Sequence, residues 1–173
     1  VQNGYQTAFM APTEVLAEQH FETLKKLLAN PWNTLRPTIG LLTSSKANIF
    51  YEDGIETVFK KEKFKEEIMR GRIHILIGTH ALIEKDLSFE RLGLVIIDEQ
   101  HRFGVEQRKA LLRQINASTI PHFLSMSATP IPRTLMMTLL GDLDVSLIIE
   151  LPRGRKGIVT KIVDPENRLK AYA

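Results

Sequence analysis

The sequence contains no cysteine among its 173 residues. Disulfide bonds and thiolate metal sites are therefore excluded, and a cytosolic location is favoured over secretion. No apolar run approaches the roughly 20 residues that a membrane-spanning helix needs, so no membrane partner is expected. The first residues, VQNGYQ, also lack the basic and then apolar order of a signal peptide. The predicted location is cytoplasmic.

A large excess of one charge is also missing. The 23 Lys and Arg residues stand against 20 Asp and Glu residues, which leaves a net charge of +3. Such a small excess is compatible with nucleic-acid binding but does not indicate it. With 43% hydrophobic and 25% charged residues, the composition is that of an ordinary globular domain.

Short apolar runs separated by helical patterns are what the sequence does contain. The predicted strands cover residues 5–10, 38–42, 73–77, 94–97, 122–126, 147–149 and 158–163. Several runs are continuous and not alternating, which is typical of strands buried on both faces of a parallel sheet. The expected fold class is α/β, an open and mostly parallel sheet with helices on both faces.

Three helices are expected between these strands. The first carries an apolar stripe formed by Ala17, Phe21, Leu24 and Leu28. Thr13 is its predicted N-cap. The other two cover residues 105–115 and about 133–141, the latter ending at a glycine. The charge run KKEKFKEE at residues 60–67 indicates a solvated helix face or, alternatively, a phosphate-binding stripe.

Polar side chains follow four of the predicted strands at their carboxyl ends. They lie in APTE after residue 10, GTH after residue 77, DEQH after residue 97 and SATP after residue 126. Ligands of open α/β sheets bind beyond the carboxyl ends of the strands. The convergence of four such ends predicts an active face.

The two adjacent carboxylates Asp98 and Glu99 can divide the work of phosphoryl transfer. One can hold Mg²⁺, while the other orients an attacking water. Alternatively, Asp98 caps a following helix and Glu99 is solvated. A third interpretation adds His101 as a metal ligand, although the remaining histidines show no paired ligand spacing.

The stretch SMSATPIPR places the hydroxyls of Ser127 and Thr129 at another strand end. Pro130 and Pro132 make the following turn rigid. Such a turn can hydrogen-bond to the DEQH groups and transmit the nucleotide state, or it is simply a turn before a helix.

Five blocks of the sequence together resemble the RecG-type branched-DNA helicases, which are ATP-dependent motors of superfamily 2. The blocks are MAPTEVLAEQH, IGTHALI, VIIDEQHRFGVEQR, MSATPIPRTL and GDLDVSLIIELPRGRK. They occur in the family order over nearly the whole chain. The transcription-repair coupling translocases are similar, but DEQHRFG favours the RecG type over the DEEQRFG of those relatives. The resemblance implies a RecA-like sheet.

The resemblance also implies ATP and Mg²⁺ as cofactors. Asp98 is implied to bind the Mg²⁺ of Mg-ATP, and Glu99 to activate the hydrolytic water. Gln100 and His101 are implied to link the nucleotide to a coupling motif. The coupling motif is formed by Ser127, Ala128 and Thr129. The residues implied to face the DNA backbone are Pro12, Thr13, Glu14, Gly78, Thr79 and His80. Ser44 stands where the family pattern has glycine.

By the same resemblance, residues 1–150 are the first RecA-like motor domain, and residues 151–173 are a linker and the start of a second. The G-x-x-x-x-G-K-[ST] phosphate loop is absent from the 173 residues. The sheet is therefore expected to be truncated at its N-terminal side, with a gap or an exposed edge through which the chain self-associates. The 173 residues alone are expected to be inactive.

The expected function is part of an ATP-dependent DNA helicase that remodels stalled forks and Holliday junctions in recombination and repair. Its expected partners are branched, double-stranded and single-stranded DNA, and the wedge and second motor domains of the parent chain. The alternatives are a double-stranded DNA translocase of the transcription-repair coupling type, a non-hydrolysing DNA-binding scaffold, and a metal-dependent nuclease.

Overall fold

The computed structural model describes residues 3–28, 36–84, 86–99, 120–128, 144–150 and 162–168. The chain divides into two compact units, Val1–Pro130 and Ile131–Ala173. The first unit contains the sheet and the helices that form the site. In the second unit, the described residues include one short 3₁₀ helix, η3 (Pro165–Asn167).

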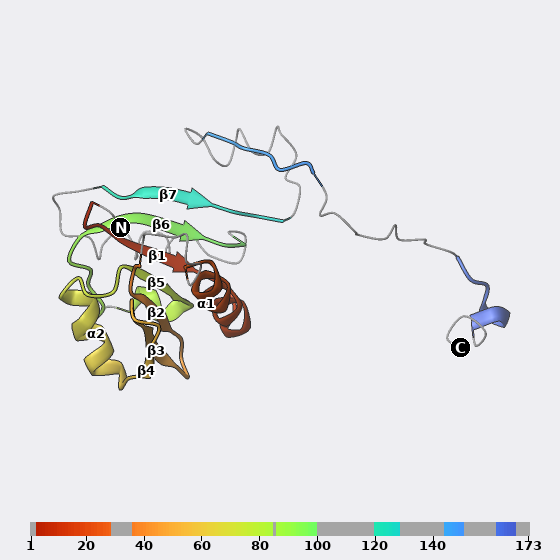
Figure 1. Cartoon of the computed structure of the whole chain (residues 1–173). Helices are drawn as coiled ribbons and strands as arrows, with labels where there is room; N and C mark the ends of the chain where they lie inside the picture. The colour runs from red at the N-terminus through yellow and green to blue at the C-terminus, as the bar shows by residue number, and fades with distance from the viewer. Residues whose placement is uncertain are drawn as a thin grey trace. The chain divides into compact units, whose positions relative to one another are not determined.

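A seven-stranded sheet forms the centre of the first unit (Figure 1). Its strands are β1 (Gln6–Met10), β2 (Ile39–Leu42), β3 (Ala47–Phe50), β4 (Glu56–Val58), β5 (Ile75–Gly78), β6 (Leu92–Ile97) and β7 (His122–Ser125). Their order is β4-β3-β2-β5-β1-β6-β7. The five strands from β2 to β7 in this order are parallel, whereas β3 and β4 pair antiparallel at one edge. The predicted open and mostly parallel sheet is confirmed.

Helix α1 (Glu14–Leu28) forms where the first apolar stripe predicted it. The Leu16 N–H donates to Thr13 Oγ1 at 3.3 Å, so Thr13 caps the helix as predicted. Glu14 in the first turn and two lysines in the last turn complement the helix dipole. Helix α2 (Lys61–Met69) contains most of the predicted charge run, and a short 3₁₀ helix η1 (His80–Ile83) follows β5. In the described part of the chain, no helix is long and apolar enough to span a membrane.

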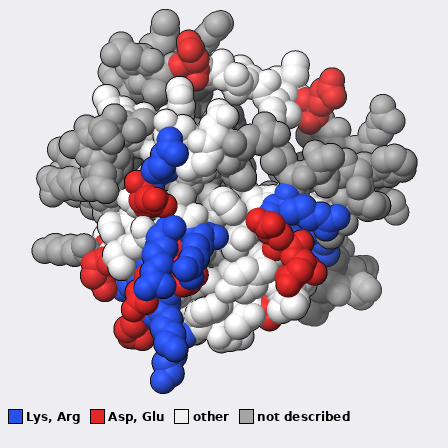
Figure 2. Space-filling model, turned by 60° about the vertical axis from the view of Figure 1, so that its left-hand side comes forward, with Lys and Arg blue, Asp and Glu red and all other residues white. Residues whose placement is uncertain are grey.

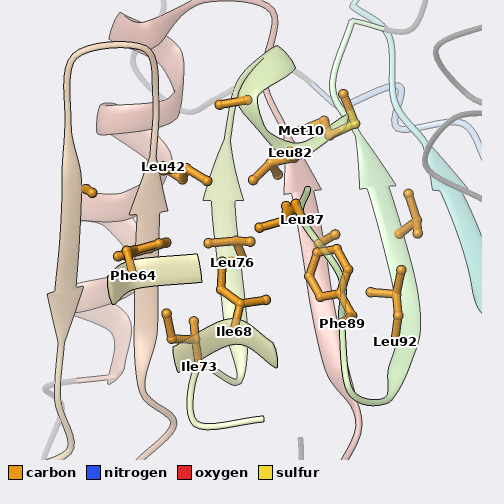
Figure 3. Packing of buried hydrophobic residues seen from close by; sticks show 14 of the residues in the cluster. Met10, Leu42, Phe64, Ile68, Ile73, Leu76, Leu82, Leu87, Phe89 and Leu92 are labelled. Carbon is orange, nitrogen blue, oxygen red and sulfur yellow. The ribbon is translucent and has the colours of Figure 1, made fainter. Parts of the chain in front are cut away.

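The two helices cover opposite faces of the sheet, as predicted. Ala17 and Phe21 of α1 are buried in one cluster with Leu41 of β2. The next residue, Leu42, points to the other face, since side chains alternate along a strand. There it lies in a cluster with Phe64 and Ile68 of α2, which Figure 3 shows in front of the sheet.

The five parallel strands end in one row at their carboxyl ends. Met10 of β1 is in register with Gly78 of β5 and with Ile97 of β6. Gly78 also pairs with Leu42 of β2, and Ile97 pairs with Ser125 of β7. The loops that carry the candidate residues therefore all leave the sheet at the carboxyl ends of its strands. This row confirms that the polar strand ends converge.

Gln6 closes the opposite, amino-terminal end of the sheet, and its side chain is buried. Its Nε2 donates to the carbonyl oxygens of Ile68 at 3.0 Å and Ile73 at 2.9 Å. Its Oε1 accepts from the N–H groups of Glu90 at 2.9 Å and Arg91 at 3.2 Å. This one amide connects the start of β1 with the end of α2 and with the segment before β6.

Some elements differ from the prediction. The hairpin of β3 and β4 was not expected, because both strands are short and β4 has exposed residues at both ends. The strand predicted at residues 147–149 is wrong, because the described residues 144–150 contain no strand. An apolar run becomes a strand only when a neighbouring strand takes up its backbone hydrogen bonds.

The other predicted elements fall largely outside the described residues. These are the helices at residues 105–115 and 133–141 and most of the strand at residues 158–163, of which residues 162 and 163 are not in a strand. The described strands pair continuously, so there is no gap among them. β7 pairs with β6 and with no other described strand, which leaves it at the edge of this sheet.

Candidate functional site

A groove opens beyond the carboxyl ends of β1, β2 and β5. It is lined by Pro12, Thr13, Glu14, Ser44, Thr79, His80, Ala81 and Glu84. Five of the six residues that the sequence implied to face DNA therefore meet in one place. They come from the loop that leads into α1 and from the start of η1, which are far apart in the chain.

Gly78, the sixth residue, has a packing role at the same edge. A Cβ atom at this position would lie 2.1 Å from the carbonyl oxygen of Leu42 and 2.9 Å from Leu82 Cδ2. Only glycine lets β5 approach β2 this closely. Thr79 and His80 follow directly, so the close approach determines where they enter the groove.

The Glu14 carboxylate in the groove is held by the turn that joins β2 to β3. Its Oε1 accepts hydrogen bonds from the Ser44 N–H at 3.0 Å and from the Ser44 hydroxyl, while Oε2 accepts from the Ser45 hydroxyl at 2.7 Å. The hydrogen bonds of Ser44 and then Ser45 lower the pKa of the Glu14 carboxyl below its usual value. The turn thereby fixes the direction of a negative charge at the groove.

The second carboxylate of the groove, Glu84, pairs with a lysine of α2. Lys65 Nζ lies 2.7 Å from Glu84 Oε2 and 2.7 Å from Asp86 Oδ2. Partial burial lowers the pKa of Lys65, but its hydrogen bonds to the two carboxylates outweigh this and raise the pKa overall. On the face shown in Figure 2, Lys and Arg side chains likewise lie beside Asp and Glu side chains. This mixture favours the solvated-face interpretation of residues 60–67.

The acidic pair follows the end of β6, in the same row. The Asp98 N–H donates to the Met10 carbonyl oxygen at 2.9 Å, which extends the parallel ladder by one residue. Glu99 then adopts a φ of 51°. This left-handed conformation costs a residue with a side chain about 1 kcal/mol or more, and such strain is concentrated at functional sites. The backbone thus turns sharply between the two carboxylates and separates their directions.

Helix α1 reaches the acidic pair through His20. The Nε2 atom of His20 lies 3.0 Å from Asp98 Oδ2, and the two side chains are 30% and 19% exposed. The His20 ring packs on the ring of Phe9, with 4.5 Å between the ring centroids. The helix that begins at the groove therefore also contacts the acidic pair.

The predicted coupling motif begins beside the acidic pair. The Met126 N–H donates to the Ile97 carbonyl oxygen at 2.9 Å, so β7 stays paired with β6 to its end. Ser127 and Ala128 follow and are exposed. Thr129 lies outside the described residues, as do Gln100 and His101.

The chemistry of the acidic pair fits a magnesium ion that is bound together with a nucleotide. Mg²⁺ prefers oxygen ligands and is commonly held by one or two carboxylates and by substrate phosphates. Among the described residues there is no group of three or more His, Asp or Glu side chains that could hold a metal by themselves. Asp98 and Glu99 carry carboxylate oxygens of the kind that such an ion prefers.

Sequence reasoning missed three contributors to the site, namely His20, Ser44 and Ser45. Ser44 was noticed only as a departure from the family pattern. The signal for His20 was its position about two helical turns after Thr13, which predicts the same side of α1. Its partner Asp98 is 78 residues away in the chain, and no local pattern links the two.

Comparisons with known proteins identify the family of the chain. The DEAD/DEAH box helicase family matches residues 1–138. The ATP-dependent DNA helicase RecG of Synechocystis sp. is 48% identical over 172 residues, which is 99% of this chain and 19% of the relative. RecG of Aquifex aeolicus is 45% identical over 99% of this chain and 20% of the relative. The predicted resemblance to RecG is confirmed, and the chain spans about one fifth of the length of these curated relatives.

Solved structures show the same fold. A structure of RecG bound to a three-way DNA junction matches 98% of this chain and 20% of its own, with 39% identity and a TM-score of 0.72. A DEAD box protein from Methanococcus jannaschii matches 80% of this chain and 34% of its own at 18% identity, with a TM-score of 0.53, and supports the fold alone. With the family matched over most of its residues, the chain belongs to the DEAD/DEAH box helicases.

Proposed function

We propose that this chain is part of an ATP-dependent DNA helicase that remodels branched DNA, such as stalled forks and Holliday junctions, in recombination and repair. The observation that carries the proposal is the single row of strand ends. It places the groove and the acidic pair at one edge of the sheet. The similarity to RecG proteins over 99% of the chain supports the choice of branched DNA.

In this proposal, the acidic pair acts on ATP. Asp98 holds the Mg²⁺ that neutralises phosphate charge, and Glu99 orients and activates the attacking water. The φ of 51° at Glu99 supports this division, because the turn gives the two carboxylates different directions. Gln100 and His101 then link the nucleotide to the hydroxyls of Ser127 and Thr129.

The groove binds the sugar-phosphate backbone of DNA. It offers the Thr13 hydroxyl, the His80 imidazole and the N-terminal end of α1. Such groups position a protein on DNA without reading its sequence. Of the two groove carboxylates, Glu84 pairs with the Lys65 ammonium group, which reduces its repulsion of phosphate, whereas Glu14 stays ionised and is held by two serines.

The remaining assignments belong to the same proposal. Residues 1–150 form the first RecA-like motor domain and residues 151–173 the linker into a second. The 173-residue chain alone hydrolyses negligible ATP and self-associates through the open edge of β7. The protein works in the bacterial cytosol, where both ATP and chromosomal DNA are found.

The test is DNA-stimulated ATP hydrolysis by the full-length gene product on branched and linear DNA. Glu99→Gln removes the proposed base without changing the size of the side chain. We expect it to lower hydrolysis by about 10²- to 10⁴-fold, the range for loss of a general base. Glu90→Gln is the matched control, since it makes the same change just before the opposite end of β6, and we expect unchanged hydrolysis.

The outcomes separate the candidate functions. Stimulation by branched DNA that Glu99→Gln abolishes supports the helicase. Stimulation by linear duplex alone favours the translocase of the transcription-repair coupling type. No hydrolysis with any DNA favours the non-hydrolysing scaffold, and metal-dependent cleavage of DNA without ATP favours the nuclease.

A further inference from the structure

We propose that His20 is a positioning residue for the Asp98 carboxylate and makes helix α1 the connection between the groove and the metal-binding end of β6. The inference rests on the proposed function, in which Asp98 holds the Mg²⁺ of Mg-ATP. No local pattern of the sequence links His20 to Asp98, which is 78 residues away in the chain.

The contact between the two side chains has a definite polarity. An ionised carboxylate only accepts hydrogen bonds, so His20 Nε2 must be the donor to Asp98 Oδ2 across the 3.0 Å contact. Nε2–H is thereby directed at one carboxylate oxygen. A carboxylate has further lone pairs that can coordinate a cation. A hydrogen bond of this kind fixes the orientation of a ligand without competing for the metal.

The imidazole is itself held in place. Its ring packs on Phe9 with 4.5 Å between centroids and 34° between the ring planes. Phe9 belongs to β1, whose neighbours are β5 and β6, so this support comes from the middle of the sheet. His20 is only 30% exposed, which limits its freedom to turn toward solvent.

The alternation of β6 explains why Asp98 meets α1. Ile97 is buried in the cluster that contains Phe64 and Ile68 of α2. The side chain of the following residue points to the opposite face, which α1 covers. The same two-residue alternation of side chains that buries Ile97 in the core therefore directs the Asp98 side chain toward His20.

Helix α1 joins the two halves of the site. Thr13 and Glu14 at its start line the groove, and His20 lies about two turns further on. A displacement of the helix start by DNA is therefore transmitted to the orientation of the Asp98 carboxylate. The direct consequence is that metal affinity at Asp98 depends on the hydrogen-bond donor at position 20.

The experiment measures Mn²⁺ binding, in place of Mg²⁺, to the full-length gene product saturated with ADP, by electron paramagnetic resonance. His20→Phe keeps an aromatic ring against Phe9 but has no N–H. We expect it to weaken Mn²⁺ binding by about 10- to 100-fold, as is usual when the hydrogen-bond partner of a metal ligand is lost. His20→Gln retains a donor at a similar reach, and we expect it to restore binding to within about threefold.

Two controls make the result specific. Thr23→Ala changes an exposed residue of the same helix, and ADP binding measured in EDTA reports the nucleotide site without metal. We expect Thr23→Ala to bind Mn²⁺ as tightly as the wild type. We also expect ADP binding in EDTA to be the same in the variants as in the wild type. Thermal unfolding of each variant, followed by circular dichroism, identifies any variant that fails to fold. His20→Phe and His20→Gln are then compared at a temperature where both are native.

The outcomes distinguish this inference from the proposed function. If Asp98→Asn weakens Mn²⁺ binding while His20→Phe stays within threefold of the wild type, His20 has no positioning role and only this inference fails. If Asp98→Asn also leaves Mn²⁺ binding unchanged, the assignment of Asp98 to the metal fails as well. Loss in His20→Phe with recovery in His20→Gln supports the inference.

Discussion

The two ends of the same parallel strands carry polar side chains of opposite kinds. At the amino-terminal end, the buried Gln6 makes four hydrogen bonds, all to backbone groups. At the carboxyl-terminal end, Thr13 and His80 are exposed in a groove, and Asp98 is partly exposed beside His20. One end is closed by its polar group, and the other presents polar groups to a ligand.

This difference distinguishes a polar side chain that stabilises the fold from the polar side chains of the proposed site. A buried amide that is fully satisfied by the backbone stabilises one arrangement of strands and offers nothing to a partner. At the other end, Thr13 and His80 lie at the surface, where a ligand can reach them. The left-handed φ of Glu99 also lies at this end, and such strain is concentrated at functional sites.

Replacement of Gln6 should give the largest change in stability. Gln6→Leu removes the side-chain donor to the carbonyl oxygens of Ile73 and Ile68, of which Ile68 keeps a second donor in the Gly71 N–H. It also removes the acceptor of the Glu90 and Arg91 N–H groups. We expect the free energy of unfolding to fall by about 3 kcal/mol, at roughly 1–3 kcal/mol for each buried group left unsatisfied. Urea denaturation of the 173-residue chain measures this.

The matched control for Gln6 is Gln19→Leu, on the exposed side of α1, with an expected change within about 0.5 kcal/mol. Equal losses in the two variants would show that the buried amide at the closed end has no special role.

Gly78→Ala should have the next largest effect, because it forces β5 away from β2 at the open end. The new Cβ would meet the Leu42 carbonyl oxygen at 2.1 Å, which the backbone must relieve. We expect a loss of about 2 kcal/mol in unfolding free energy. We also expect weaker DNA binding by the full-length gene product, measured by fluorescence anisotropy, because Thr79 and His80 move with the strand end.

Gly54→Ala provides the comparison for Gly78. A Cβ there meets nothing within 4 Å, although φ is +87°, so this variant measures the conformational cost alone, about 1 kcal/mol. If both alanine variants lose the same stability and bind DNA alike, the close approach of β5 to β2 does not shape the groove.

Thr13→Ala should have a smaller effect on stability and a measurable effect on DNA. Loss of the hydrogen bond to the Leu16 N–H removes the N-cap, at about 1 kcal/mol. Loss of one hydroxyl contact to phosphate should weaken DNA binding about fivefold, the equivalent of one hydrogen bond. Thr13→Ser keeps the hydroxyl and should recover both properties; recovery of stability without recovery of DNA affinity would contradict a direct contact through the hydroxyl.

The double variant Ser44→Ala and Ser45→Ala should give the smallest effect, a rise in the pKa of Glu14 toward its usual value. The hydroxyls hold this pKa low, so their stabilising contribution is fully present above the pKa of the unfolded chain. It is lost as the pH falls through the lower pKa of the folded protein. Carbon-13 NMR titration of the Glu14 carboxyl measures the rise.

Ser88→Ala, at an exposed serine away from the groove, is the control for this titration. An unchanged Glu14 titration in the double variant would show that the turn does not hold the carboxylate.

Local patterns predicted much of the open end of the sheet. The stripe that begins with Ala17 and Phe21 predicted α1, and Thr13 was correctly expected as its cap. The polar residues after Met10 and Ile97 were expected to converge, and the register of the strands brings them into one row. These features depend on short-range periodicity and on the rule that parallel strands end together.

Features that depend on distant partners escaped prediction. The run at residues 147–149 is as apolar as a strand, yet it does not form one. The short strand β3 pairs with the edge of β2, and β4 in turn pairs with β3. The four bonds of Gln6 join segments that are more than 60 residues away from it in the chain.

The sequence by itself determined the periodicity of the strands and of α1, the polar residues at the strand ends, and the family motifs that they form. Only the tertiary structure decided that Gln6 is structural, that Ser44 and Ser45 hold Glu14, and that His20 meets Asp98. The physical reason is the separation in sequence over which each effect acts. Periodicity and capping act over a few residues, whereas a hydrogen bond between side chains 78 residues apart exists only after the sheet has set its register.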